Sequence, residues 1–114
     1  MPRALLEYGT KFYFLGIDTM FVVLLKFSDQ RSRAPEFMQA HKDWIKRGFE
    51  DGVFLLAGSL HENVGGGIFA HNTSLEALQK RVNEDPFIVH DVVTADVLEM
   101  SPSLADERLN FLLV

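Results

Sequence analysis

Two side chains in this 114-residue sequence could act together as a general base and its partner. His41 lies among apolar residues that recur every three or four positions, where an imidazole is largely shielded from water. Asp85 directly precedes Pro86 and Phe87. A carboxylate that accepts a hydrogen bond from an imidazole fixes the tautomer of the ring and raises its basicity. His41 and Asp85 are therefore the candidate catalytic residues, provided that the fold brings them together.

Taken singly, each of these residues also has an ordinary structural interpretation. His41 could be a core histidine satisfied by one hydrogen bond, and Asp85 could be a carboxylate in a turn that ends a helix. Ser59 follows an apolar run that ends in Gly58, so it could donate a hydrogen bond to a ligand or be an ordinary serine at the end of a strand. The fold must decide between these alternatives.

The remaining polar motifs predict no cofactor or metal site. Gly65-Gly66-Gly67 lacks the spacing of a phosphate-binding loop, and we expect it to be a flexible hairpin tip. His61, His71 and His90 fall in or near expected loops with no two at metal-ligand spacing, so we expect them at the surface. The sequence has no Cys, which excludes disulfides and sulfur-ligated metals and favours a reducing, cytoplasmic location.

The charge balance argues against two classes of partner. The chain carries 11 Lys and Arg against 16 Asp and Glu, and its net charge is −5. Nucleic acids and anionic membrane surfaces require a basic stripe, and the basic stretches here are short and interrupted. No apolar run approaches the roughly 18 residues that a transmembrane helix needs. The sequence therefore predicts neither a nucleic-acid nor a membrane partner.

The order of predicted elements indicates an α+β fold. Apolar periodicity predicts the order strand, helix, strand, strand, helix, strand of a ferredoxin-like βαββαβ protomer, with both helices on one face of an antiparallel sheet. Such helices run side by side, so His41 and the end of the second helix can meet. The strands are expected over 20–27, 53–59, 68–70 and 92–100. The two helices are expected over 35–51 and from Thr73 or Ser74 to Val82, with Glu76 in a capping box. A last short helix is expected from a Ser103 cap to about Leu113.

The first predicted strand is apolar on both of its faces. Phe21, Val23 and Leu25 would point to one side, and Val22 and Leu24 to the other. One face is covered by the helices, and a second copy of the sheet is the simplest cover for the other. We therefore expect a homodimeric α+β barrel or an assembly of such dimers.

The chain divides into three expected segments. Residues 20–100 form the domain, and residues 1–19 are a leader that does not resemble a secretory signal. This leader could be an added segment, the product of an upstream start, or an extra edge strand. Residues 101–114 form a helical tail that could pack over a sheet edge or a partner.

Over roughly 20–100 the sequence resembles the YciI-like family (YCII-related domain). The most specific matches are His41 midway along the first helix and Asp85-Pro86-Phe87. The other matches are the opening strand 20–25, the second-strand motif 51–59, the glycines 65–67 and the start of the second helix at 74–77. The chain departs from the family at Ser59, where many relatives have Pro, and in its leader and tail.

The resemblance implies a fold and a set of roles. It implies a dimeric α+β barrel in which the His and the Asp of the D-P-F motif form a catalytic dyad in a pocket. These roles fall on His41 and Asp85, with Ser59, Gly58 and Phe87 binding substrate. One family member is a dehydrochlorinase of a chlorinated hydroxyquinol. Two hypotheses follow: a cofactor-free lyase- or isomerase-like enzyme for a small cyclic or phenolic metabolite, or a non-catalytic ligand-binding or dimeric interaction module.

Overall fold

The sheet is built around β1 (Met20–Phe27), whose β-branched, Leu and Phe residues suit a buried central strand. The computed structural model describes residues 19–113, so the expected leader lies outside the described residues except for Thr19. The other elements are α1 (Ala34–Glu50), β2 (Phe54–Leu60), β3 (Gly65–Ala70), α2 (Leu75–Val82), α3 (Pro86–Val89) and β4 (Val93–Met100), with 3-10 turns at Arg31–Arg33, His61–Asn63 and Glu107–Leu113.

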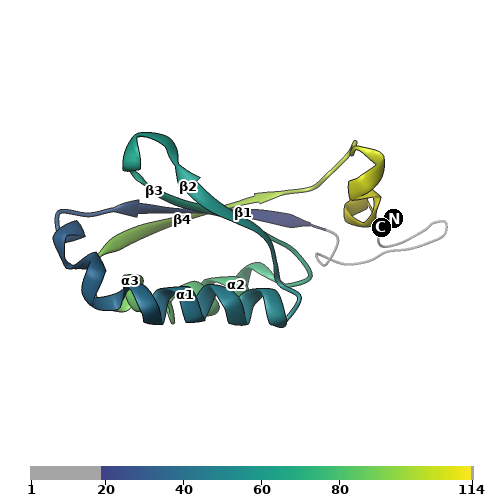
Figure 1. Ribbon diagram of the computed structural model, residues 1–114. Coiled ribbons are helices and arrows are strands. Elements are labelled where there is room, and N and C mark those ends of the chain that lie inside the picture. The colour runs from purple at the N-terminus through teal and green to yellow at the C-terminus, as the bar shows by residue number, and fades with distance from the viewer. Residues whose placement is uncertain (1–18, 114) are drawn as a thin grey trace.

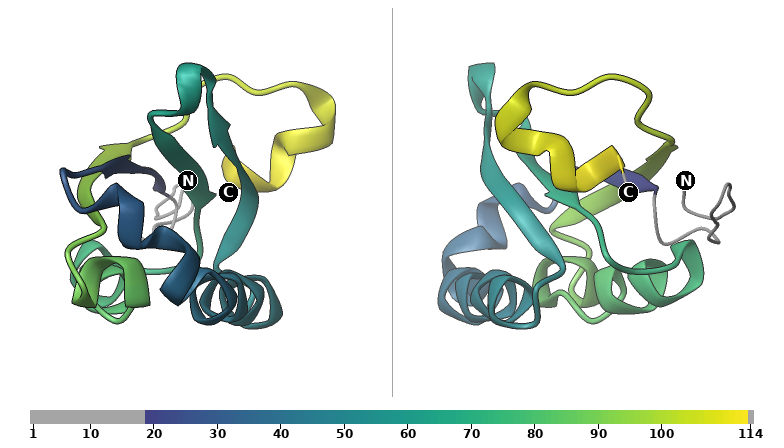
Figure 2. Two further views of the ribbon diagram at one scale, coloured as in Figure 1. Left: turned by 60° about the vertical axis from the view of Figure 1, so that its left-hand side comes forward. Right: turned by 90° about the vertical axis from the view of Figure 1, so that its right-hand side faces the viewer.

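The four strands form one antiparallel sheet in the order β2-β3-β1-β4. The three helices α1, α2 and α3 lie on one face of this sheet (Figures 1 and 2). The expected ferredoxin-like α+β fold is therefore confirmed. None of the helices among residues 19–113 is long and apolar enough to cross a membrane.

The core lies between α1, α2 and the sheet. Phe21, Val23 and Leu25 of β1 are buried and face the helices, while the alternating Val22 and Leu24 face the other side. The largest buried side chain is Trp44 of α1, the only Trp in the sequence. Its indole nitrogen donates a hydrogen bond to the carbonyl oxygen of Arg81 at 3.0 Å, which ties α1 to α2.

Gly48 of α1 allows the helix to approach the ring of Phe54 closely. A Cβ atom at position 48 would lie 2.1 Å from Cδ2 of Phe54. The Phe54 ring also packs edge-on against Trp44, with their centroids 5.3 Å apart. This glycine therefore sets the distance between helix and sheet.

We expect Gly48→Ala to destabilise the protein by about 1–3 kcal/mol, because overpacking outweighs the gain of about 1 kcal/mol in helix propensity. Urea denaturation followed by Trp44 fluorescence measures this change. In a Phe54→Leu background, which removes the obstructing ring, the cost of Gly48→Ala should fall. An equal cost in both backgrounds would show that the ring does not cause the loss.

The glycine-rich segment is not the flexible hairpin tip that the sequence predicts. Gly65, Gly66 and Gly67 are part of β3 and pair with both β1 and β2. The reversal between the strands occurs at His61–Asn63, where Glu62 and Asn63 adopt positive φ angles. Gly65 is required because its φ is 148° and a Cβ there would meet the backbone oxygen of Leu25.

Three details of the expected helix ends also differ from the structure. Ser74 caps α2 by accepting a hydrogen bond from the Ala77 amide, which makes Ala77 the N3 residue and leaves Glu76 outside a capping box. Pro86, which follows the carboxylate expected in a turn that ends a helix, begins the short α3. The last helix is a 3-10 helix over Glu107–Leu113 that does not start at Ser103, because Asp106 accepts the local hydrogen bond from the Arg108 amide.

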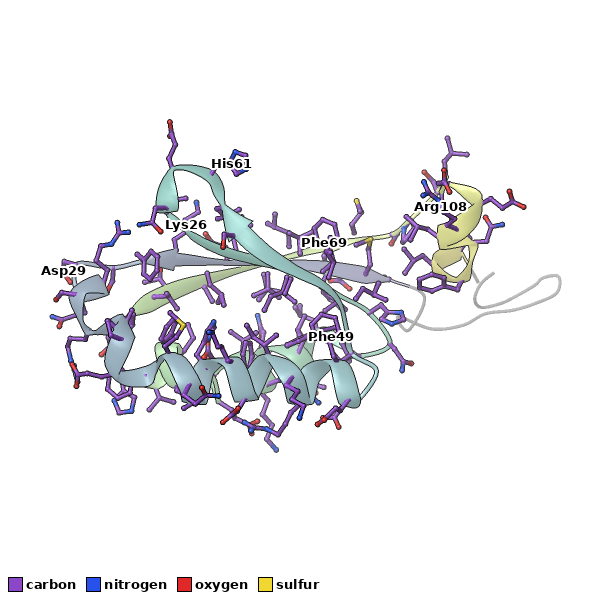
Figure 3. All side chains as sticks on the ribbon, in the orientation of Figure 1. Lys26, Asp29, Phe49, His61, Phe69 and Arg108 are labelled. Carbon is purple, nitrogen blue, oxygen red and sulfur yellow. The ribbon has the colours of Figure 1, made fainter. Side chains whose placement is uncertain are left out.

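The face of the sheet without helices carries exposed apolar side chains. Figure 3 shows Lys26 and Phe69 on this side and Phe49 between α1 and the sheet. The tail leaves β4 beyond the end of the sheet (Figure 1). Its Phe111 ring contacts the ring of His71. The large exposed residues of the helix-free face are Leu56, Phe69, Leu98 and Met100.

Candidate active site

His41 is held midway along α1 by aromatic stacking. Its ring lies parallel to the ring of Phe87, with the centroids 4.0 Å apart and the planes 6° from parallel. Trp44 stacks against it more loosely, at 5.9 Å. The His41 side chain is 13% exposed, so one part of the ring is accessible from a largely apolar environment.

Asp85 is positioned by the start of α3. Its Oδ1 atom accepts a hydrogen bond from the Phe87 amide at 3.0 Å, which makes Asp85 the N-cap of that helix. Pro86 suits the first helical position because it has no amide hydrogen to satisfy. The sequence Asp85-Pro86-Phe87 thus folds into a cap that aims the carboxylate at α1.

The fold brings His41 and Asp85 into direct contact. Nδ1 of His41 lies 2.8 Å from Oδ1 of Asp85, and the Asp85 side chain is completely buried. Because a carboxylate accepts hydrogen bonds, Nδ1 carries the proton and Nε2 of the neutral ring keeps its lone pair. Nε2 has no hydrogen-bond partner among the described residues. The ring is therefore arranged to accept a proton at Nε2.

The second carboxylate oxygen of Asp85 is unsatisfied. Oδ2 is buried without a hydrogen-bond partner among the described residues. A buried unpaired acceptor costs roughly 1–3 kcal/mol. A positive charge on His41, 2.8 Å from Oδ1, would offset part of this cost.

We expect Asp85→Ala to destabilise the protein by about 2–4 kcal/mol, because it removes the α3 cap and leaves the Nδ1 proton of His41 without an acceptor. Asp85→Asn keeps an acceptor oxygen for both donors and should stay within about 1 kcal/mol of the parent. Urea denaturation followed by Trp44 fluorescence compares the two variants. Equal losses in both would contradict the dual role of Oδ1.

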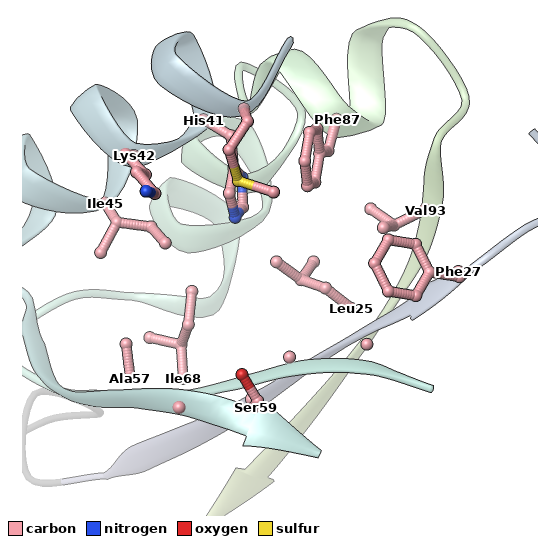
Figure 4. Close-up of a pocket in the computed structure, with 15 residues that line it drawn as sticks. Leu25, Phe27, His41, Lys42, Ile45, Ala57, Ser59, Ile68, Phe87 and Val93 are labelled. Atoms are coloured by element: carbon pink, nitrogen blue, oxygen red, sulfur yellow. The ribbon is translucent and has the colours of Figure 1, made fainter. Parts of the chain in front are cut away.

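The His41 ring lines an apolar pocket of about 320 Å³ between α1, α3 and the sheet (Figure 4). Ser59, Gly58 and Phe87, the expected substrate-binding residues, line the same pocket. An apolar cavity of about 150 Å³ is large enough for benzene, so this one has room for a substituted six-membered ring. Four of the five candidate residues thus line one cavity. The fifth, Asp85, contacts His41 from behind.

Sequence reasoning missed other residues that line the pocket. Lys42 follows His41 directly, and helical periodicity alone assigns it to the polar side of α1. Gly66 was missed because the glycines were expected in a turn. Its pairing with Ser59 across β2 and β3 could have been found only from the strand register.

The other histidines lie outside this pocket. His90 stacks on Phe37, with the ring centroids 3.9 Å apart. Burial lowers the pKa of His71, while a hydrogen bond with the Gly52 backbone opposes this shift. Within residues 19–113, no group of His, Asp and Glu residues is arranged to hold a metal ion.

No protein-family model matches the sequence, and no curated protein sequence is detectably similar to it. The structure is similar to that of 5-chloro-2-hydroxyhydroquinone dehydrochlorinase from Burkholderia phenoliruptrix in complex with 2,5-dihydroxybenzoquinone. The TM-score is 0.60 at 13% identity, over 69% of this chain and 90% of that one. This likeness establishes a shared fold.

Two further structures match with a TM-score of 0.43. The cofactor-independent oxygenase SnoaB from Streptomyces nogalater is 11% identical over 76% of this chain and 94% of that one. The heme-degrader MhuD from Mycobacterium tuberculosis is 17% identical over 77% of this chain and 98% of that one.

Proposed function

We propose that this chain is a YciI-like, cofactor-free enzyme in which His41 acts as a general base on a small cyclic or phenolic metabolite. One observation carries the proposal: His41 is hydrogen-bonded through Nδ1 to the buried Asp85, while its ring lines an open apolar pocket. A purely structural histidine would need neither the buried carboxylate nor access to a cavity.

The chemistry is a proton transfer. Nε2 of His41 takes a proton from a hydroxyl group or an activated carbon of the ring, and the electrons of that bond move into the ring. The imidazolium that forms is stabilised by the Asp85 carboxylate. Return of the proton to another atom gives isomerisation, whereas departure of a leaving group such as chloride with its electron pair gives elimination. We assign substrate binding to Ser59, Gly58 and Phe87.

The comparison with the dehydrochlorinase supports this class of reaction. That enzyme shares the fold and is named for a chlorinated hydroquinone substrate, a ring of the size that the pocket here accommodates. The resemblance of the sequence to the YciI-like family rests on the same His41 and Asp85.

The test is release of chloride from 5-chloro-2-hydroxyhydroquinone, with binding of 2,5-dihydroxybenzoquinone measured in parallel by calorimetry. We expect chloride release by the parent and its loss in His41→Gln, because Gln can hydrogen-bond to Asp85 but cannot accept the proton. Binding without turnover would overturn the catalytic proposal and support the non-catalytic ligand-binding alternative.

We also propose that residues 20–100 form the domain and that a second copy covers its helix-free face. Leu56, Phe69, Leu98 and Met100 expose large apolar surface there. Lys26 and Asp96 lie on the same face without an ion-pair partner among the described residues. Opposite charges on one patch suit a two-fold contact, because Lys26 of each copy can then face Asp96 of the other copy.

In this proposal the tail 101–114 extends from the dimer, and larger assemblies are built from dimers. Residues 1–19 are assigned as a leader or an extension that lies outside this domain. We infer a cytoplasmic location from the lack of Cys in the sequence.

A further inference from the structure

The α1 wall of the pocket carries a cation without a counter-ion. Lys42 lines the pocket next to His41, and Figure 4 shows its side chain between His41 and Ile45. Its ammonium group forms no ion pair or hydrogen bond within residues 19–113. Lys46, one turn later on the same helix, instead pairs with Glu50 at 3.7 Å. Lys42 is therefore available to a ligand.

The pocket contains no acidic side chain to neutralise Lys42. Its titratable lining residues are His41 and Lys42, and Asp85 contacts His41 from behind with its side chain fully buried. The remaining lining is mostly apolar, and Lys42 itself is exposed to solvent. The pocket is thus biased toward anions in a chain whose net charge is −5.

The sheet side of the pocket provides a second polar group and a flat surface. Ser59 of β2 points its hydroxyl into the pocket, and this hydroxyl has no hydrogen-bond partner among the described residues (Figure 4). Gly66 of β3 is paired directly with Ser59. A Cβ atom at Gly66 would meet only the Gly58 carbonyl oxygen, at 3.3 Å, so the space above it is open.

We propose that the ligand is a small ring bearing an anionic oxygen, a phenolate or carboxylate, and that Lys42 selects it by pairing with this charge. This inference rests on the proposed function and names its substrate class. The ring lies over Gly66, Ser59 hydrogen-bonds to a ring substituent, and the reacting proton faces Nε2 of His41. Lys42 is a specificity-determining residue, and His41 remains the base.

The test compares benzoate with benzamide, two rings of matched size that differ in charge. Calorimetry on the full chain at neutral pH should show benzoate binding about tenfold more tightly than benzamide, as expected for a partly solvated charged hydrogen bond. Lys42→Met should remove this preference, whereas the control Lys46→Met should keep it. Gly66→Val, which fills the space above the strand, should weaken both ligands without changing their ratio.

Equal affinities of the parent for the two rings would overturn the inference, as would a preference that survives in Lys42→Met. Failure of both rings to bind at millimolar concentration would also overturn it. None of these results tests whether His41 can act as a base. That role is tested separately, by measuring which ring nitrogen of His41 carries the proton in the absence of any ligand. The two proposals therefore fail separately.

Discussion

His41→Gln is expected to lower the rate of chloride release from 5-chloro-2-hydroxyhydroquinone by about 10²–10⁴-fold, the usual contribution of a positioned general base. Gln can still donate to Oδ1 of Asp85, so the pocket and the α3 cap should persist. The loss should appear in kcat more than in KM, because the missing interaction belongs to the transition state.

Asp85→Asn should give a rate loss of similar order although the variant remains folded. An amide can accept the Nδ1 hydrogen bond but cannot balance the charge of the imidazolium that forms during proton transfer. Lys46→Met, at a residue that does not line the pocket and pairs with Glu50, serves as the control with parental rate. A rate in Asp85→Asn equal to that of the parent would contradict the role assigned to the carboxylate.

Leu98→Glu is expected to raise the dissociation constant of the homodimer by more than about 10³-fold. Leu98 pairs with Val22 on the helix-free face and is exposed in the single chain. In a two-fold interface each substitution places two carboxylates in an apolar contact, and each costs several kcal/mol unless paired. Sedimentation velocity over a range of concentrations measures the shift.

Val89→Glu is the matched control for this change. Val89 is an exposed apolar residue of α3, on the opposite side of the molecule. Its substitution should leave the dimer intact. A parent that is monomeric at micromolar concentration, or a Leu98→Glu protein that dimerises like the parent, would contradict the proposed assembly.

The fold could be predicted from sequence because its elements have distinct periodicities. The apolar run of Met20–Phe27 and the three-to-four spacing along Ala34–Glu50 required no tertiary information. The error at Gly65–Gly67 arose because glycines are typical of turns, whereas here the close approach of the Leu25 backbone requires one within a strand. Such a contact between strands is invisible in local sequence.

The candidate site was predictable only in part. His41 and Asp85 could be paired because the fold places the two helices side by side. The details could not be predicted: that Oδ1 serves both His41 and the Phe87 amide, that Oδ2 is unsatisfied, and that Lys42 reaches the pocket. These depend on the four-residue helix α3 and on side-chain orientations that periodicity does not encode.

The most direct test of the His41 base is the tautomer of its ring, measured by long-range ¹H–¹⁵N NMR at a pH where the ring is neutral. We expect the proton to reside on Nδ1 in the parent, held by Asp85, and Nε2 to be unprotonated. In Asp85→Ala, where the acceptor is lost, this preference should weaken or disappear. A parent ring protonated mainly on Nε2, or a tautomer ratio unchanged in Asp85→Ala, would contradict the role of His41 as a base positioned by Asp85.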